Sequence, residues 1–252
     1  MENKTQTEAV IETVELLGGF ATLQELYCQA LTIPGVVWKT KTPDASIRRI
    51  VQTSGHFFNI RPGLWALKKF KDKLPRHIEE LQEKKVYDKS TPSIHSYYQG
   101  LLVELGNLMD YSTYIPPQDK NKIFVNKPLC KVATLEALPP FTYEEVLGKV
   151  KSIDVIWMNQ SRLSFPAYVF EIENSTDFLR SLTKFFEIRD FTTQMLFVAP
   201  DRKKKQFNEI INSEIFMELK NRVKFWSYDY VDQVYNSSFP QAKLKKQMKL
   251  LH

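Results

Sequence analysis

The hydrophobic positions of this chain follow two patterns, and each pattern predicts one kind of secondary structure. Apolar residues spaced three or four apart predict helices, first over residues 7–17 and later after Thr42-Pro43, where proline suits the first helical position. Two β-rich runs at 57–60 and 64–67 flank a short turn and predict a hairpin. A further helix is expected between these two helices, with Leu23, Leu26 and Tyr27 on one face. Three helices followed by a hairpin predict a winged helix-turn-helix over residues 1–70.

The second half of the chain has a different order of elements, which predicts a separate domain over residues 93–252. A helical rhythm at 95–111 comes first and a loop-rich stretch follows. The remaining expected elements are a helix at 142–150, strands at 153–157 and 167–173, a helix carrying Phe178 and Phe186, a strand at 195–199, a helix at 203–212 and a strand at 223–227, before C-terminal helices. The strand at 195–199 is apolar throughout, as expected in a sheet covered on both faces.

The segment 71–92 joins these two parts. It is rich in Lys and Glu and is punctuated by Pro75 and Pro92, which predicts a linker helix. The predicted fold class is therefore α+β. A winged helix-turn-helix is followed by an α/β domain that is built on a central mixed sheet.

Three carboxylates lie on the two predicted strands at 153–157 and 167–173. If these strands form a hairpin, with residue 158 opposite 167, Asp154 lies opposite Glu171. Side chains alternate along a strand, so Glu171 and Glu173 point to the same face. Like charges on an apolar surface repel strongly. The sequence therefore predicts a divalent cation here, with Mg²⁺ as the expected ion and Mn²⁺ as the alternative.

Positive charge is concentrated between residues 38 and 73, where nine Lys and Arg side chains face only two acids. With a pI near 9.1, this cluster favours a polyanionic partner, although a solvated surface is the alternative. The expected contacts to double-stranded DNA come from the third helix, the residues just before it and the hairpin. They are Lys41, Ser46, Arg48, Arg49, Gln52 and Arg61. Arg48, Arg49 and Gln52 are expected to face outward, away from Ile47, Ile50 and Val51.

Two resemblances extend this interpretation. The stretch TPDASIRRIVQTSGHFFNIRPGLWAL resembles the HARE-HTH winged-helix family, over about residues 5–68. The order helix, acid-bearing hairpin, helix and buried strand is similar to the core of the PD-(D/E)xK nucleases, over roughly residues 93–235. That resemblance implies a restriction-like DNA endonuclease in which Asp154 and Glu171 bind Mg²⁺. Glu173 stands where this family usually has Lys, which resembles its Glu-x-Glu variant.

The PD-(D/E)xK resemblance also implies roles for the preceding helix. In these nucleases that helix often adds a fourth acid, and the matching residue is Glu104, expected to lie near Asp154 and to contribute to metal binding. Gln99, about one turn earlier, is a candidate DNA contact. Glu173 either completes the metal coordination or acts as a general base, and the products carry 5′-phosphate and 3′-hydroxyl ends.

Composition excludes several other classes of protein. No apolar run is long enough to span a membrane and no signal-peptide pattern is present, which predicts a cytoplasmic protein. Cys28 and Cys130 match no metal spacing and are expected to be buried, reduced thiols. Double-strand cleavage predicts a homodimer. A non-catalytic DNA-binding regulator and a protein-interaction module remain as alternatives.

Overall fold

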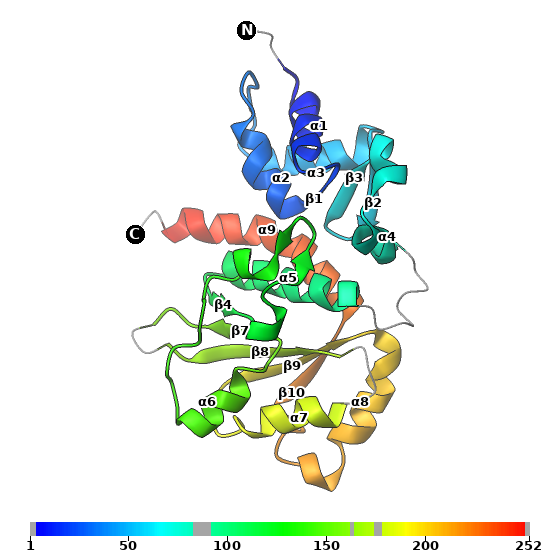
Figure 1. The fold of residues 1–252 in the computed structure, drawn as a ribbon. Coiled ribbons are helices and arrows are strands. Elements are labelled where there is room, and N and C mark those ends of the chain that lie inside the picture. The colour runs from blue at the N-terminus through cyan, green and yellow to red at the C-terminus, as the bar shows by residue number, and fades with distance from the viewer. Residues whose placement is uncertain (1–3, 83–91, 162–163, 174–177, 250–252) are drawn as a thin grey trace. The chain divides into compact units, whose positions relative to one another are not determined.

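The computed structural model describes residues 4–82, 92–161, 164–173 and 178–249, with the side chains described through 238. The chain divides into two compact units, residues 1–84 and 85–252 (Figure 1). Part of the predicted linker helix at 71–92 and the expected helix cap at Asn174 or Ser175 lie outside the described residues.

The first unit combines helices with a small sheet. Its elements are α1 (Gln6–Leu16), β1 (Phe20–Thr22), α2 (Leu23–Gln29), a 3₁₀ turn at Ala30–Thr32, α3 (Pro43–Thr53), β2 (Phe57–Arg61), β3 (Leu64–Leu67), a 3₁₀ turn at Lys68–Lys73 and α4 (Arg76–Gln82). The strands form an antiparallel sheet in the order β1-β3-β2. The hairpin of β2 and β3 was predicted, whereas the third strand, β1, was not.

Local sequence signals explain where these helices begin. Thr5 and Thr22 each cap a helix through a reciprocal capping box with Glu8 and Glu25, which satisfies two otherwise unpaired backbone donors at each helix start. Thr42 occupies the cap position of α3 but its side chain makes no capping bond, and Pro43 begins the helix. As predicted, Ile47, Ile50 and Val51 face the core of this unit, which they share with residues of α1, α2 and the sheet.

The second unit is built around a mixed five-stranded sheet, which confirms the predicted α+β class. Its main elements are α5 (Pro92–Leu108), β4 (Ser112–Tyr114), β5 (Ile123–Phe124), β6 (Lys127–Pro128), α6 (Glu144–Val150), β7 (Val155–Met158), β8 (Pro166–Ile172), α7 (Phe178–Phe186), β9 (Gln194–Ala199), α8 (Lys204–Ile211), β10 (Val223–Ser227) and α9 (Tyr228–Lys249). The strand order is β10-β9-β8-β7-β4. β8, β9 and β10 are parallel, and β7 and β4 add antiparallel strands.

Helices cover both faces of this sheet. Figure 1 shows α5 and α9 on one side, and α6 and α7 on the other. The side facing α7 is apolar, because Ile156, Val169 and Phe197 pack there against Phe178 and other buried residues of α7. Glu171 follows Val169 by two positions on β8 and so faces the same side.

The register of β7 and β8 agrees with the sequence prediction near the acids. Val155 pairs with Phe170 and Ile156 with Val169, so the residue before β7, Asp154, lies opposite Glu171. The prediction is wrong at the turn end, where Met158 pairs with Pro166 rather than residue 167. A register shift between Trp157 and Met158 causes this difference, since a bulge adds a residue on one strand only.

Close packing holds α5 against β7. Gly106 lies against Thr113 and the indole of Trp157, where an added Cβ would be closer than atoms normally approach. The Trp157 indole donates a hydrogen bond to the Leu102 carbonyl, 2.9 Å away. These contacts involve the C-terminal half of α5, and Gln99, nearer its N-terminus, contacts the backbone of Asp154 just before β7, at the end of the sheet where the acids lie.

Several peripheral features correct or agree with the sequence expectations. Cys28 and Cys130 are both exposed thiols, whereas buried thiols were expected. No described helix has the length and apolar character needed to cross a bilayer.

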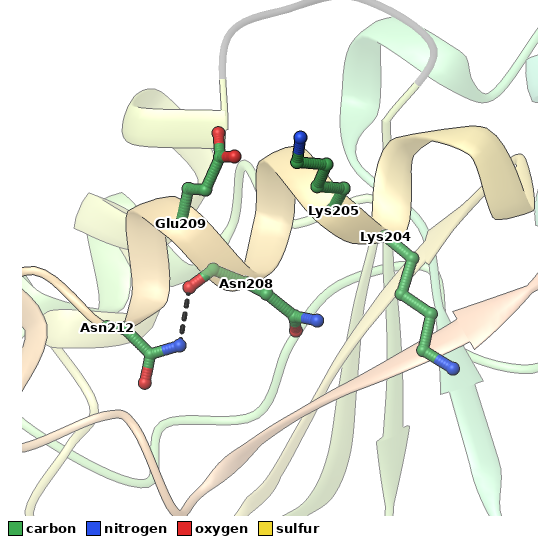
Figure 2. Close-up of a pocket in the computed structure, with 5 residues that line it drawn as sticks. All are labelled: Lys204, Lys205, Asn208, Glu209 and Asn212. Carbon is green, nitrogen blue, oxygen red and sulfur yellow. Dashed lines mark hydrogen bonds between the residues drawn. The ribbon is translucent and has the colours of Figure 1, made fainter.

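On α8, a shallow hollow is lined by exposed side chains, Lys204, Lys205, Asn208, Glu209 and Asn212 (Figure 2). The first turn of α8 is therefore exposed to solvent at Lys204 and Lys205.

Candidate active site

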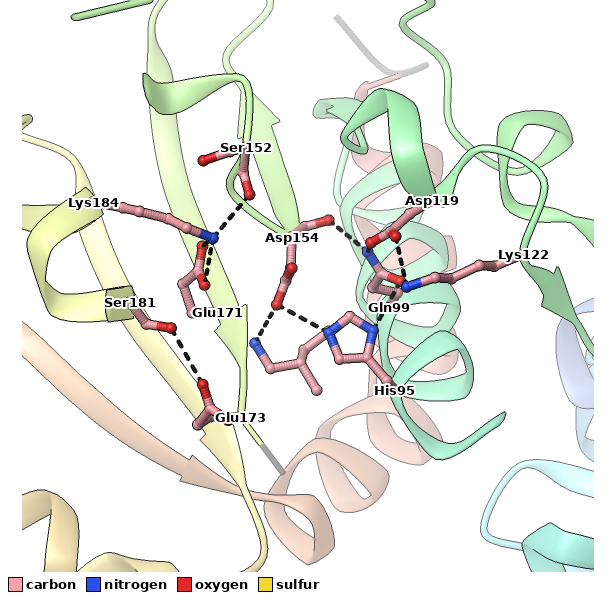
Figure 3. Close-up of polar contacts among 11 residues, drawn as sticks. His95, Gln99, Asp119, Lys122, Ser152, Asp154, Glu171, Glu173, Ser181 and Lys184 are labelled. Carbon is pink, nitrogen blue, oxygen red and sulfur yellow. Dashed lines mark hydrogen bonds and ion pairs between the residues drawn. The ribbon is translucent and has the colours of Figure 1, made fainter. Parts of the chain in front are cut away.

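Asp154 and Glu171 form the centre of a polar network at one end of the sheet (Figure 3). Asp154 precedes β7, and its Oδ2 accepts a hydrogen bond of 2.8 Å from the backbone N–H of Ile172 on β8. Glu171 lies one residue earlier on β8, and its side chain is buried. The hairpin register therefore brings the two acids together, as the sequence predicted.

Lys184 of α7 forms an ion pair with the carboxylate of Glu171. The Nζ of Lys184 donates to both oxygens, at 2.8 and 2.9 Å, and to the Ser152 carbonyl at 2.9 Å. Burial and the neighbouring Asp154 charge raise the pKa of Glu171 to about 8, against the lowering effect of Lys184. The geometry alone resembles a fixed ion pair, but a buried acid beside a second acid holds its proton more tightly. The pKa of Glu171 is therefore raised even though Lys184 contacts both of its oxygens.

His95 of α5 contacts the other acid. Its Nε2 lies 3.2 Å from Asp154 Oδ2, and its Nδ1 lies 3.2 Å from Gln99 Oε1. Burial lowers the pKa of His95, but the hydrogen bond and charge of Asp154 outweigh burial and leave that pKa raised. Burial raises the pKa of Asp154, yet His95, the Ile172 N–H and Lys184 together hold it below its ordinary value. The site therefore favours an ionised Asp154 beside a cationic His95.

Gln99 extends this network to a third carboxylate. Its Nε2 donates to Asp119 Oδ2 at 2.7 Å and to the backbone carbonyl of Asp154 at 3.0 Å. Asp119 is buried and also pairs with Lys122 at 2.6 Å. The sequence prediction that Gln99 contacts DNA is not supported by this position, because its side chain is fully buried and its amide is used inside the protein.

Glu173 lies at the edge of the same site. It follows β8, its backbone N–H donates to the Val198 carbonyl, and its side chain is half-buried. Ser181 of α7 donates to Glu173 Oε2 at 3.3 Å, and a hydrogen bond with Ser181 also lowers the pKa of Glu171. Both glutamates thus approach the same serine, in agreement with their predicted common face.

Glu104 lies elsewhere on α5. At about 100° per residue it points roughly 180° around the helix from His95, which faces Asp154. Its buried carboxylate accepts a hydrogen bond from the Tyr235 hydroxyl of α9 and lies 4.0 Å from the Lys127 ammonium. The sequence argument for a metal near Glu104 depended on a buried acid without a partner. Tyr235 and Lys127 remove that argument.

The predicted DNA contacts of the first unit differ in exposure. Lys41, Arg49 and Gln52 are exposed, and Ser46 and Arg48 are half-buried. Arg61 is only 4% exposed, at the irregularity between β2 and β3. Its side chain is turned into the unit, so the structure does not favour Arg61 as a surface contact.

A family model shows where this chain belongs. The model of the C-terminal domain of the type II restriction enzyme NmeDI matches residues 73–249, which is more than half of the chain. The chain belongs to this family. Searches of the curated proteins and of the solved structures returned no significant match. Membership supports the expected restriction-type endonuclease, and the PD-(D/E)xK assignment, the winged helix and the metal dependence stay predictions.

The acid pair of this NmeDI-type domain suits a hard cation. Asp154 uses only Oδ2 in its contacts with other described residues, which leaves Oδ1 for a ligand. Mg²⁺ commonly takes one or two carboxylates and completes its shell with water and phosphate. Among the described residues no cluster of three or more His, Cys, Asp or Glu side chains is arranged to hold an ion. Asp154 and Glu171 supply two carboxylates, within the number that Mg²⁺ commonly takes from a protein.

Lys184, His95 and Asp119 were not identified from the sequence as members of the site of this NmeDI-type domain. Lys184 was hidden because it lies on the helix after the acid strand, thirteen positions from Glu171. The one available signal was its place beside Leu182 and Phe185, whose spacing marks the buried face of α7. His95 and Asp119 gave no such signal, since their partners come from distant segments.

Proposed function

We propose that this protein is a Mg²⁺-dependent endonuclease that hydrolyses phosphodiester bonds in double-stranded DNA, with Mn²⁺ as the alternative ion. Membership of a restriction-enzyme family supports the reaction class. The observation that carries the site is the opposition of Asp154, just before β7, and Glu171 on β8, with Lys184 bound to Glu171. This arrangement fits the Glu-x-Glu variant of the PD-(D/E)xK nucleases, with Glu173 as its last acid.

Each side chain has a distinct task in this proposal. Asp154, through Oδ1, and Glu171 would hold the cation, which would lower the pKa of a bound water and stabilise the charge that builds up on the phosphate. Glu173 is more open to solvent than Glu171 and acts as the general base that accepts a proton from the attacking water. The products carry 5′-phosphate and 3′-hydroxyl ends.

Lys184 replaces the lysine that Glu173 displaces from the usual motif. In the PD-(D/E)xK nucleases that lysine helps to position the attacking water. Here the Lys184 ammonium, on the helix α7 that follows the strand, lies 2.8 Å from Glu171. We assign Lys184 the same task, because it is a buried cation at the acid pair and is held there by Ser152 as well.

The first unit is proposed to read DNA as a winged helix. α3 places Arg49 and Gln52 at its exposed surface, and Lys41 precedes it. Arg49→Ala in the full chain is expected to weaken DNA binding by about 1–3 kcal/mol if Arg49 reads a guanine edge. An equal loss on every DNA sequence identifies a phosphate contact instead, and no loss removes Arg49 from the interface.

A homodimer and sensitivity to base modification complete the proposal. Cutting both strands requires two active sites, which a dimer supplies. Sedimentation of the full chain with and without DNA tests the assembly. Cleavage of matched methylated and unmethylated genomic DNA, followed by sequencing of the ends, tests the effect of modification and identifies the site.

The central test removes Asp154. The full-length Asp154→Asn variant should keep its fold and its DNA binding but lose Mg²⁺-dependent cleavage, because the substitution keeps the shape and removes the charge. Asp201→Asn, which changes an exposed acid in the 3₁₀ turn before α8, is the matched control and should cut normally. Cleavage by Asp154→Asn at the wild-type rate contradicts the site. DNA binding without cleavage by the wild-type chain would favour the regulator alternative.

A further inference from the structure

The donor and the acceptor of each hydrogen bond can be assigned in the network that ends at Asp154. Gln99 Nε2 faces two groups that can only accept, the Asp119 carboxylate and the Asp154 carbonyl. This fixes the orientation of the amide, so that Gln99 Oε1 accepts from His95 Nδ1. The other ring nitrogen, Nε2, then donates to Asp154 Oδ2. Asp119 is thus connected to Asp154 through two intermediate side chains.

Asp154 is held at two places by this network. Its side chain is held at Oδ2 by both His95 and the Ile172 N–H, and its backbone carbonyl is held by Gln99. Rotation of the carboxylate would break both Oδ2 bonds at once. Gln99 and Asp119 are buried, where such bonds are stronger than in water and costly to leave unmade.

We propose that Gln99 and His95 are positioning residues that hold Asp154 with Oδ1 directed to the cation and Oδ2 closed to it. The inference rests on the proposed function, since it assigns these residues a task in that site. It adds a specific geometry, in which α5 and the segment of Asp119 determine how β7 presents its acid. Partners of this kind typically change metal affinity or activity by about 10–100-fold when they are removed.

Two substitutions of His95 separate its two hydrogen bonds. The Nε2 of Gln is as many bonds from the Cα as the Nε2 of His, so His95→Gln keeps a donor for Asp154. The Nδ2 of Asn corresponds to the Nδ1 of His, so His95→Asn keeps a donor for Gln99 and loses the bond to Asp154. His56→Asn, an exposed histidine of the first unit, is the control.

The measurement is Mn²⁺ binding to the full-length protein, followed through the electron paramagnetic resonance signal of the free ion. We expect about 10–100-fold weaker binding for His95→Asn, near wild-type binding for His95→Gln and no change for His56→Asn. Gln99→Met, which keeps side-chain length without the amide, should weaken binding as His95→Asn does. If His95→Asn does not fold, the Mn²⁺ affinity of Gln99→Met tests the positioning role instead.

The outcomes separate this inference from the proposed function. If Asp154→Asn binds Mn²⁺ as well as the wild type, the proposed metal site fails. If Asp154→Asn loses Mn²⁺ while His95→Asn and Gln99→Met bind it normally, only the positioning role fails. Equal losses in His95→Asn and His95→Gln also overturn it, because the bond to Asp154 Oδ2 then has no special part.

Discussion

Replacing Lys184 tests how the buried acids are stabilised. Its Nζ donates to both oxygens of Glu171 and to Ser152, and the two side chains are only 17% and 4% exposed. Lys184→Met keeps most of the aliphatic chain and removes the charge. Removing one partner of a buried ion pair costs about 3–5 kcal/mol, because the other charge stays buried without compensation. This figure is an upper bound for Lys184→Met, because Glu171 can reduce the loss in the free energy of unfolding by taking up a proton.

The size of the loss should depend on pH in a defined direction. Glu171 has a pKa raised to about 8 from an ordinary value of 4.5, so the folded protein holds a proton that the unfolded chain releases between these values. At about pH 6 Glu171 is mostly neutral, and Lys184→Met removes only hydrogen bonds worth about 1 kcal/mol. At about pH 9 Glu171 is ionised in the wild type, but it can take up a proton in Lys184→Met, which adds about 1.4 kcal/mol for the one pH unit above its pKa of about 8, so a loss of about 2–3 kcal/mol is expected.

Equilibrium unfolding in urea, without divalent ions, measures this difference. The matched control is Lys149→Met, which breaks the more exposed pair with Glu187, at 56% and 27% exposure, and should cost less than about 1 kcal/mol at both pH values. The double variant Lys184→Met/Glu171→Gln should recover part of the loss at the higher pH. Equal effects of Lys184→Met and Lys149→Met at about pH 9 would refute the reasoning.

Two further predictions concern stability. Glu171→Gln should remove a decline of up to about 1.4 kcal/mol per pH unit in the free energy of unfolding, between the ordinary pKa of 4.5 and about 8; wild-type and variant urea curves that stay parallel over this range contradict it. Gly100→Ala should cost about 1–3 kcal/mol, since its Cβ would overlap the buried ring of Phe124, whereas Gly148→Ala in α6 meets nothing and should stabilise by about 0.5–1 kcal/mol. Urea unfolding of both variants checks this pair, and a neutral Gly100→Ala would show that Phe124 moves aside easily.

Much of the fold could be predicted because its signals are local. Helical spacing located α1, α3 and α5, and apolar β-rich runs located β7 and β8, whose pairing as a hairpin places Asp154 opposite Glu171. β4 was missed because it has only three residues within a loop-rich stretch. Its place in the sheet depends on pairing with β7, a contact that the short segment does not encode by itself.

The candidate site was predictable only for residues on one hairpin. Glu171 and Asp154 are related by strand geometry, which a sequence reveals directly. His95 and Gln99 reach Asp154 across more than fifty positions of the chain, and their contacts depend on how α5 packs on β7. Glu104 shows the converse, since its helix was predicted well but its partner, Tyr235, lies on a helix 131 positions away.

The structure also changes the argument that led from acids to a metal. Like charges at Asp154 and Glu171 were expected to require a divalent ion, yet the protein supplies two cations of its own, His95 at one acid and Lys184 at the other. The fold can therefore keep both acids buried without a metal. A divalent ion bound here would have to compete with Lys184 for Glu171, whereas Oδ1 of Asp154 would be available to it from the start. Such an ion would gain further oxygen ligands from a phosphate, so the same competition would favour an ion bound together with DNA over one bound alone.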